Sequence, residues 1–135
     1  MLVREKLAKI VFNHPEKLKE LNSIIHPKVK IHFDNWIKQH SNSAFVVKEA
    51  AILFESGSYK DCDFVVTVTA PLEIRIKRVL KRDQTTRENV ISRINAQWTD
   101  EQRTSKSDYV IENVNLNEAK NQVGQILKKL TIQQN

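Results

Sequence analysis

Apolar residues recur at helical spacing near the start of the chain. They fall on one face in each of three segments, which span residues 2–12, 15–25 and 29–37. Pro15 suits the first turn of the second segment. The His26-Pro27 pair should separate the second segment from the third, because the residue before a proline disfavours helical backbone. The pattern therefore predicts three helices, the last of which ends in the polar stretch 40–43.

The pattern changes after residue 43, where short apolar runs replace the helical spacing. Ala44–Val47 and Asp63–Ala70 are typical of buried strands, and Tyr109–Ile111 of a third, short one. Helices are expected over residues 71–81, 100–105 and 115–130, and a further helix before 100–105 carries Val90, Ile91, Ile94 and Trp98. Strands that alternate with helices indicate an α/β fold with a parallel sheet, here of three strands.

Two of these helices have a recognisable start. Pro71 follows the second predicted strand and suits the first turn of a helix. Thr85 is followed three residues later by Glu88, which is the pattern of a capping box. We therefore expect Thr85 to cap the helix that carries Val90 and Trp98.

Composition narrows the class of protein. Hydrophobic residues make up 40% of the 135 residues and charged residues 28%, so the chain can form a buried core and is not expected to be disordered. Only 2 glycines are present, which favours helices and leaves no Gly-rich phosphate loop among these residues. The single cysteine excludes an internal disulfide and a Cys-based zinc site. No signal peptide or membrane-length apolar run is found, and we expect a soluble, cytoplasmic protein.

The chain is basic, with a formal net charge of +6 and a pI near 9.5. This balance suits an anionic partner, which could be a nucleotide, a nucleic acid or an acidic surface. The basic residues are spread along the sequence, and that distribution is equally typical of a solvated basic surface.

Arginines on one predicted helix are the first candidates for chemistry. Arg78 and Arg82 are four residues apart and share a face, and Arg75 lies about one turn earlier. A guanidinium fork matches phosphate oxygens and stays charged, so this face suits phosphate binding. Arg93 adds a candidate on the next helix. The alternative is a basic helix that only faces solvent.

Three further residues occupy positions where a site could form. His26 lies at a predicted helix junction, where it could also serve as a capping or packing residue. Glu55 and Asn113 each follow a segment predicted to be a strand, and ligands of open α/β sheets bind beyond the carboxyl ends of strands. Glu55 could equally be an ordinary surface carboxylate, and Asn113 could contact a nucleotide base or cap a loop. The remaining histidines show no metal-ligand spacing.

Six segments in a fixed order resemble the dephospho-coenzyme A kinase family. They read VREKLAKIVF, LNSIIHPKV, KEAAILFESG, APLEIRIKRVLKRD, SRINAQ and KSDYVIEN. They are similar to the family's Arg-containing helix, its His-Pro signature, its Leu-Phe-Glu segment, the two arginines and the Arg-Ile-x-x-Gln of its lid, and its Asp-x-Val-Ile-x-Asn strand. Ser107 stands where the family usually has Ala. Each motif alone is weak, whereas six in family order with compatible gaps are specific.

This resemblance implies a P-loop kinase that phosphorylates the ribose 3′-hydroxyl of dephospho-coenzyme A, the last step of coenzyme A biosynthesis, with ATP and Mg²⁺. It also implies four regions along the chain. These are a helical coenzyme A-binding region at 1–43, core strands at 44–74, a lid at 75–106, and a core strand with a closing helix at 107–135.

The same resemblance implies roles for individual residues. Arg82 is expected to be catalytic, since it would contact the transferring phosphates. Arg78 is expected to stack on the adenine of ATP, with Arg93 and Asn113 also in the ATP site. The remaining residues implied in substrate binding are Arg4, His26 and Glu55. No residue of the chain is assigned to a metal.

One departure from the family pattern concerns the phosphate-binding loop. In the family, a first strand, a Gly-rich loop with its Lys and Ser/Thr, and an Asp proposed as general base precede the first helix seen here, and nothing in this chain replaces them. We therefore expect the chain alone to be inactive. The family's strand order places the missing strand between 44–49 and 63–69, which predicts an open slot, direct pairing of these two strands, or a strand-exchanged oligomer.

Two functions of other classes stay open. The chain could be a non-catalytic module that binds coenzyme A or a nucleotide. It could also be a basic nucleic-acid-binding domain, although it lacks interleaved aromatic residues and a clustered basic face, so nucleic acid is an improbable partner. A membrane partner is not expected.

Overall fold

The computed structural model describes residues 3–134, which fall into two compact units, Met1–Glu49 and Ala50–Asn135. The predicted helix start at Leu2 lies outside the described residues. Within them, no helix has the length and hydrophobicity needed to cross a membrane.

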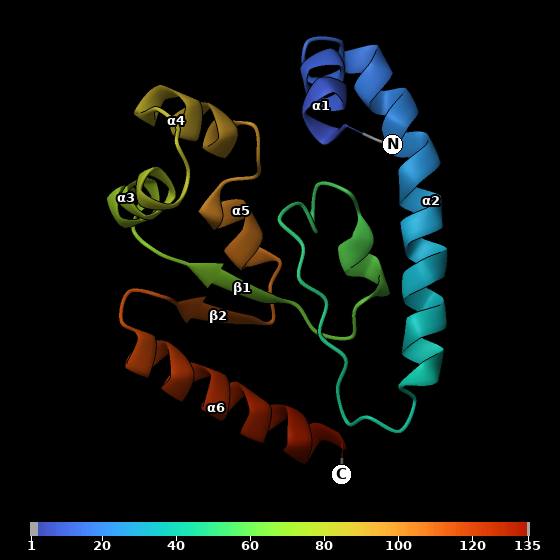
Figure 1. The fold of residues 1–135 in the computed structure, drawn as a ribbon. Helices are drawn as coiled ribbons and strands as arrows, with labels where there is room; N and C mark the ends of the chain where they lie inside the picture. Colours follow the sequence, from blue (N-terminus) through green and yellow to red (C-terminus); the bar gives the residue numbers. More distant parts are fainter. Residues whose placement is uncertain (1–2, 135) are drawn as a thin grey trace. The chain divides into compact units, whose positions relative to one another are not determined.

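The first unit consists of two helices, α1 (Arg4–Phe12) and α2 (Pro15–Gln39), followed by an irregular segment (Figure 1). The two helices pack on each other, and Val11 of α1 is buried. Asn13 ends α1, where its side-chain amide donates a hydrogen bond to the carbonyl of Lys9 at 2.9 Å. Pro15 lies in the first turn of α2, as predicted.

The predicted break at His26-Pro27 is wrong, because α2 runs through Pro27 as one helix of 25 residues. A proline inside a helix removes one backbone hydrogen bond and crowds the preceding turn, which disfavours a helix without always ending it. Here the residues on both sides, among them Leu21, Ile24, Val29 and Phe33, keep the helical spacing. The continuous pattern therefore prevails over the local preference of the proline.

The second unit is built around a small parallel sheet (Figure 1). Strands β1 (Val66–Thr69) and β2 (Tyr109–Glu112) pair in register from Val66 with Tyr109 to Thr69 with Glu112. The other elements are η1 (Ser58–Asp61) before β1, then α3 (Leu72–Arg82), α4 (Arg87–Asn95) and α5 (Asp100–Ser105) between the strands, and α6 (Leu116–Gln134) after β2. α5 packs against β1 and α6 against β2 (Figure 1).

The sheet of the described residues has two strands, and the three-stranded prediction is wrong in one place. Residues 45–50 form neither helix nor strand. A segment forms a strand only where another strand pairs with it, and the sheet of the described chain consists of β1 and β2. β1 pairs with β2 alone, which leaves one edge of β1 without a strand among the described residues.

Packing of the second unit centres on α3 and α4. Ile76 of α3 is fully buried and Val90 of α4 is 2% exposed, so the two helices pack together through these side chains. Asp108 ties the two strands at their start, because its Oδ2 accepts a hydrogen bond from the Val65 amide at 2.7 Å. Because the strands pair in parallel, the residues that follow β1 and β2 lie at the same edge of the sheet.

Helix caps differ slightly from the prediction. Thr86, and not Thr85, caps α4, since its hydroxyl accepts a hydrogen bond from the Asn89 amide at 3.3 Å. Either threonine can cap, and the side chain one residue before the first helical turn is the one that reaches. Thr99 and Gln102 form a reciprocal capping box at the start of α5, which the sequence reading did not include.

Candidate functional site

The carboxyl ends of β1 and β2 carry the first group of candidate residues. Asn113 follows β2, and its backbone amide donates a hydrogen bond to the backbone carbonyl of Thr69 at 2.7 Å. Arg78 of α3 reaches the same place, where its Nη1 donates to the Asn113 carbonyl at 2.6 Å and its Nη2 to the Val114 carbonyl at 3.1 Å. The structure therefore brings together Arg78 and Asn113, which the sequence assigned to one site from positions 35 residues apart.

These two hydrogen bonds fix the plane of the Arg78 guanidinium. Donors of a guanidinium lie in its plane, so a group that bonds two carbonyls edge-on keeps its flat faces for stacking. The Arg78 side chain is exposed. This geometry suits a planar ring lying on the guanidinium.

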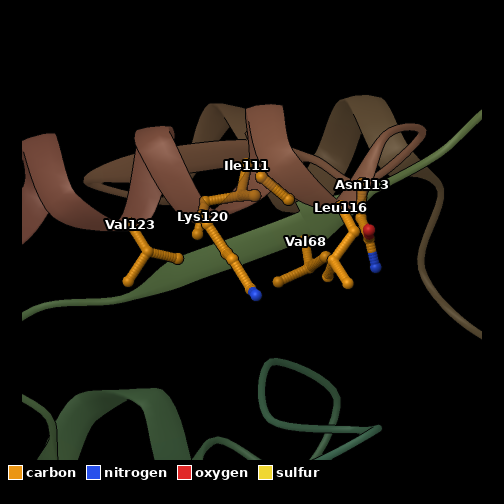
Figure 2. Close-up of a pocket in the computed structure, with 7 residues that line it drawn as sticks. Val68, Ile111, Asn113, Leu116, Lys120 and Val123 are labelled. Atoms are coloured by element: carbon orange, nitrogen blue, oxygen red, sulfur yellow. The ribbon is translucent and has the colours of Figure 1, made fainter.

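A shallow groove of about 290 Å³ begins at Asn113 and runs between β1 and α6 (Figure 2). It is lined by Val68, Ile111, Asn113, Leu116, Ala119, Lys120 and Val123. Figure 2 shows the amide of Asn113 and the amine of Lys120 among apolar side chains. Ile111 on β2 is buried, whereas Val68 on β1 is 60% exposed. The groove therefore lies along β1, which pairs only with β2 among the described residues.

Arg82 and Arg93 converge on one carboxylate, that of Asp83. Arg82 donates from Nε at 2.8 Å and from Nη2 at 3.1 Å, and Nη1 of Arg93 lies 3.5 Å from Oδ2. The hydrogen bonds from Arg82, together with the charge of Arg93, hold the pKa of Asp83 below its ordinary value. In return, the hydrogen bond to Asp83 raises the pKa of Arg82. The side chains of both arginines are mostly exposed, 72% for Arg82 and 60% for Arg93.

A second exposed ion pair joins α3 to α4. Arg87 donates two hydrogen bonds to Glu73, at 2.9 and 2.6 Å. The hydrogen bond from Arg87 lowers the pKa of Glu73, and the same contact raises the pKa of Arg87. This pair connects the two helices and contacts none of the candidate residues in the described chain.

A second pocket, of about 300 Å³, lies among α3, the end of α4 and α5. Its walls are Leu72, Arg75, Ile94, Asn95, Gln97, Trp98, Thr99, Asp100 and Arg103. Arg75 does not join the exposed phosphate-type face that the spacing suggested. It donates two hydrogen bonds to Asp100, at 3.2 and 2.7 Å, while its Nε is buried without a hydrogen-bond partner.

Glu55 is the ion-pair partner of Arg103, which lines this pocket. Its Oε1 is 3.9 Å from Nε of Arg103, and the two side chains are only 20% and 19% exposed. Both carboxylate oxygens are buried, and neither accepts a hydrogen bond. The alternative that Glu55 is an ordinary surface carboxylate is therefore wrong. Its preceding residue, Phe54, is buried and stacks on Trp98 with ring centres 5.4 Å apart.

Arg4 and His26 belong to the first unit. Arg4 is the first residue of α1, and His26 lies in the middle of α2; both side chains are exposed. Among the described residues no hydrogen bond or ion pair joins them to each other. Since His26 is inside a helix, the interpretation of this residue as a cap at a helix junction is wrong.

The sequence reading did not identify Arg103, although it is the most enclosed arginine of the pocket. Its Nη2 donates a hydrogen bond to Gln97 Oε1 at 2.7 Å. No local pattern signals this role, because Arg103 follows a capped, polar turn of α5 and its partner Glu55 is far away in sequence. Among residues 3–134, no three His, Cys, Asp or Glu side chains are close enough to hold a metal ion.

The chain matches the family model described as Dephospho-CoA kinase over residues 1–118. A dephospho-CoA kinase of Chlorobium chlorochromatii is 43% identical over 116 residues, which are 83% of this chain and 54% of the relative. That of Chlorobaculum tepidum is 38% identical over 133 residues, which are 96% of this chain and 64% of the relative. The chain thus spans between about half and two thirds of the length of these curated relatives.

Two solved structures share the fold. The crystal structure of TT1252 from Thermus thermophilus superimposes with a TM-score of 0.80 at 30% identity, over 95% of this chain and 66% of the other. The dephospho-CoA kinase from Campylobacter jejuni gives a TM-score of 0.65 at 30% identity, over 99% of this chain and 68% of the other.

Proposed function

Because this chain belongs to the dephospho-CoA kinase family, we propose that it supplies the lid and substrate-binding side of a kinase that phosphorylates the 3′-hydroxyl of dephospho-coenzyme A with ATP. One observation carries this proposal most directly. Arg78 and Asn113, which come from a lid helix and a strand end, meet at the carboxyl edge of the sheet. Nucleotide sites of open α/β sheets lie at this edge.

The adenine of ATP would lie on the flat face of Arg78. The carbonyls of Asn113 and Val114 hold the guanidinium edge-on, so its plane is set before a base arrives. The Asn113 side chain can then offer both a donor and an acceptor to the edge of the base. This pre-set geometry lowers the loss of side-chain entropy on binding.

The phosphates of ATP would be contacted by Arg82 and Arg93. Their guanidinium groups already converge on the carboxylate of Asp83, which occupies a place where a phosphate oxygen would be equally well bound. Arg82 would stabilise the charge that spreads over the transferring phosphoryl group. Arg93 would assist it from α4.

The acceptor substrate would be bound by Arg4, His26 and Glu55. Glu55 has the strongest support, since its two buried oxygens accept no hydrogen bond from the described protein, and a ligand hydroxyl would supply the missing donor. Arg4 and His26 offer exposed donors on the first unit. Such groups can bind the anionic pyrophosphate of dephospho-coenzyme A.

Catalysis by this chain alone is not expected. Its 135 residues include no Gly-rich loop with a lysine. Positioning and electrostatic stabilisation supply most of phosphoryl-transfer catalysis, and such a loop provides much of both.

Joining the amino-terminal segment of a full-length relative to this chain tests the proposal. We expect the hybrid chain to form coenzyme A from dephospho-coenzyme A and ATP in a Mg²⁺-dependent reaction, while the 135-residue chain forms none. Turnover by the chain alone would contradict the expected inactivity. A folded hybrid that binds ligand without turnover would favour a non-catalytic module, and salt-dependent binding of DNA would favour the nucleic-acid alternative.

A further inference from the structure

Arg103 joins three parts of the second unit through one side chain and one carbonyl. Its Nε faces Glu55, and its Nη2 donates to Gln97, which lies between α4 and α5. Its carbonyl accepts a hydrogen bond from the Ser107 hydroxyl at 2.8 Å. Ser107 is itself hydrogen-bonded to Thr67, which is buried in β1.

The donor can be assigned in both hydrogen bonds of the Ser107 hydroxyl. A hydroxyl has one proton, and that of Ser107 is given to the Arg103 carbonyl, so the Thr67 hydroxyl must be the donor in the other bond. α5 is thereby anchored to the sheet by side chains as well as by packing. Arg103 therefore extends from a backbone whose position is set by β1.

Glu55 needs this arginine for a physical reason. A buried carboxylate that accepts no hydrogen bond is costly unless a positive charge lies close to it. Arg103 lies within 3.9 Å but donates no hydrogen bond to Glu55. The cation thus compensates the charge, and both buried oxygens keep their capacity to accept a hydrogen bond.

Gln97 explains why the arginine keeps this geometry. Its Oε1 accepts Nη2 of Arg103 at 2.7 Å, and this bond orients the guanidinium with Nε toward Glu55. A lysine could carry the same charge, yet it could not contact both groups with fixed geometry. The fork of the arginine is what links the two.

We propose that Arg103, a residue of the predicted lid, is a positioning residue: it holds the buried Glu55 carboxylate in place without donating to it, so that a hydroxyl of the acceptor substrate can supply the missing hydrogen bond, and it links this carboxylate to Gln97. The inference rests on the proposed function of Glu55 in substrate binding. It adds a residue that the sequence did not indicate and makes the position of the carboxylate dependent on the lid.

The first test needs no ligand. In the 135-residue chain, Arg103→Lys should shift the NMR signals of the Gln97 side-chain amide and of the Glu55 carboxyl carbon together. Arg87→Met, which removes an exposed arginine of a two-bond ion pair, is the matched control and should shift neither. Unchanged Gln97 and Glu55 signals in Arg103→Lys would overturn the positioning role.

The second test measures binding of dephospho-coenzyme A by calorimetry in the hybrid chain. Glu55→Gln and Arg103→Met should each weaken binding by about tenfold, and the double variant by no more than either alone, because both act through one carboxylate. The affinity for ATP should be unchanged in all three. Arg103→Lys should recover part of the loss, and it keeps the test decisive if Arg103→Met fails to fold.

The outcomes separate the two proposals. If Glu55→Gln leaves binding unchanged, the substrate role of Glu55 fails and the inference fails with it. If Glu55→Gln weakens binding but Arg103→Met does not, only the positioning role is overturned. Additive losses would also overturn it, since they would mean that Arg103 contacts the substrate independently of Glu55.

Discussion

The ion-paired arginines of the second unit form two groups that differ in solvent exposure more than in the chemistry of their partners. Arg82, Arg87 and Arg93 of the exposed group have side chains 48–72% exposed, and they pair with Asp83 or Glu73. Arg75 and Arg103 line the second pocket, with side chains 28% and 19% exposed. Each of the five lies between 2.6 and 3.9 Å from a carboxylate oxygen, so ion pairing itself does not distinguish the two groups.

The two groups differ in whether water and salt can compensate for the loss of an ion-pair partner. Water and salt compensate readily for the loss of an exposed partner, so such pairs contribute little to stability and are free to exchange their carboxylate for a ligand. An enclosed partner cannot be replaced in this way. The exposed arginines are therefore suited to bind an incoming anion, whereas the enclosed ones hold other side chains in place.

The largest effect is expected at an exposed arginine, and on activity. In the hybrid chain, Arg82→Ala should lower turnover by on the order of a hundredfold, the scale of a lost transition-state contact. Arg78→Ala should mainly weaken ATP binding, because it removes the stacking surface. Steady-state kinetics on both variants, with thermal melting as the folding control, check this; near-normal values for both would remove the lid assignment.

The next effect concerns stability. Arg103→Met should lower the free energy of unfolding by about 2 kcal/mol, because the enclosed Glu55 loses its compensating charge. Denaturant unfolding of the 135-residue chain measures the change. The double variant with Glu55→Gln should recover part of it, and a full loss in the double variant would mean that Arg103 stabilises the fold by packing alone.

Substitutions at helix caps test whether α5 as a whole, rather than Arg103 alone, positions Glu55. Thr99→Ala disturbs the start of α5 without removing a charge and should cost about 1 kcal/mol of stability. Thr86→Ala removes the single cap bond of α4 and should cost about 0.5 kcal/mol. If Thr99→Ala shifts the Glu55 signals as strongly as Arg103→Lys does, the positioning of Glu55 comes from α5 as a whole.

The smallest effect is expected at the exposed pairs. Glu73→Gln should leave the melting temperature at pH 7 unchanged within error.

The lowered pKa of Asp83 means that its carboxylate favours the folded state above the ordinary carboxyl pKa, and this contribution is lost as pH falls through the lowered value. An NMR titration should place Asp83 below its ordinary pKa, and Arg82→Met should move it upward; an unmoved midpoint would contradict the pairing.

The sequence predicted most helices of this chain because their periodicity extends over several turns. It also placed β1 and β2 correctly, since both are short β-branched runs. It failed at Pro27, where a local preference opposed a long pattern, and at Ala44–Val47, where strand formation depends on a neighbour rather than on the segment itself.

Prediction of the site had a similar limit. The family resemblance assigns Arg78 and Asn113 to one site, and strand-end geometry supports Asn113 alone. The pairing of Arg75 with Asp100, 25 residues away, could not be inferred, and neither could the contact between Arg103 and Glu55. Such contacts depend on how helices pack and leave no periodic trace in the sequence.

The two strands of the sheet meet across a long stretch of chain, with Val65 and Asp108 separated by 43 positions. α3, α4 and α5 all lie within this stretch. Closing such a loop costs conformational entropy that rises with the number of flexible residues. Helices that form early shorten the flexible part, so the rate at which the two strands pair should follow the helicity of the segments between them.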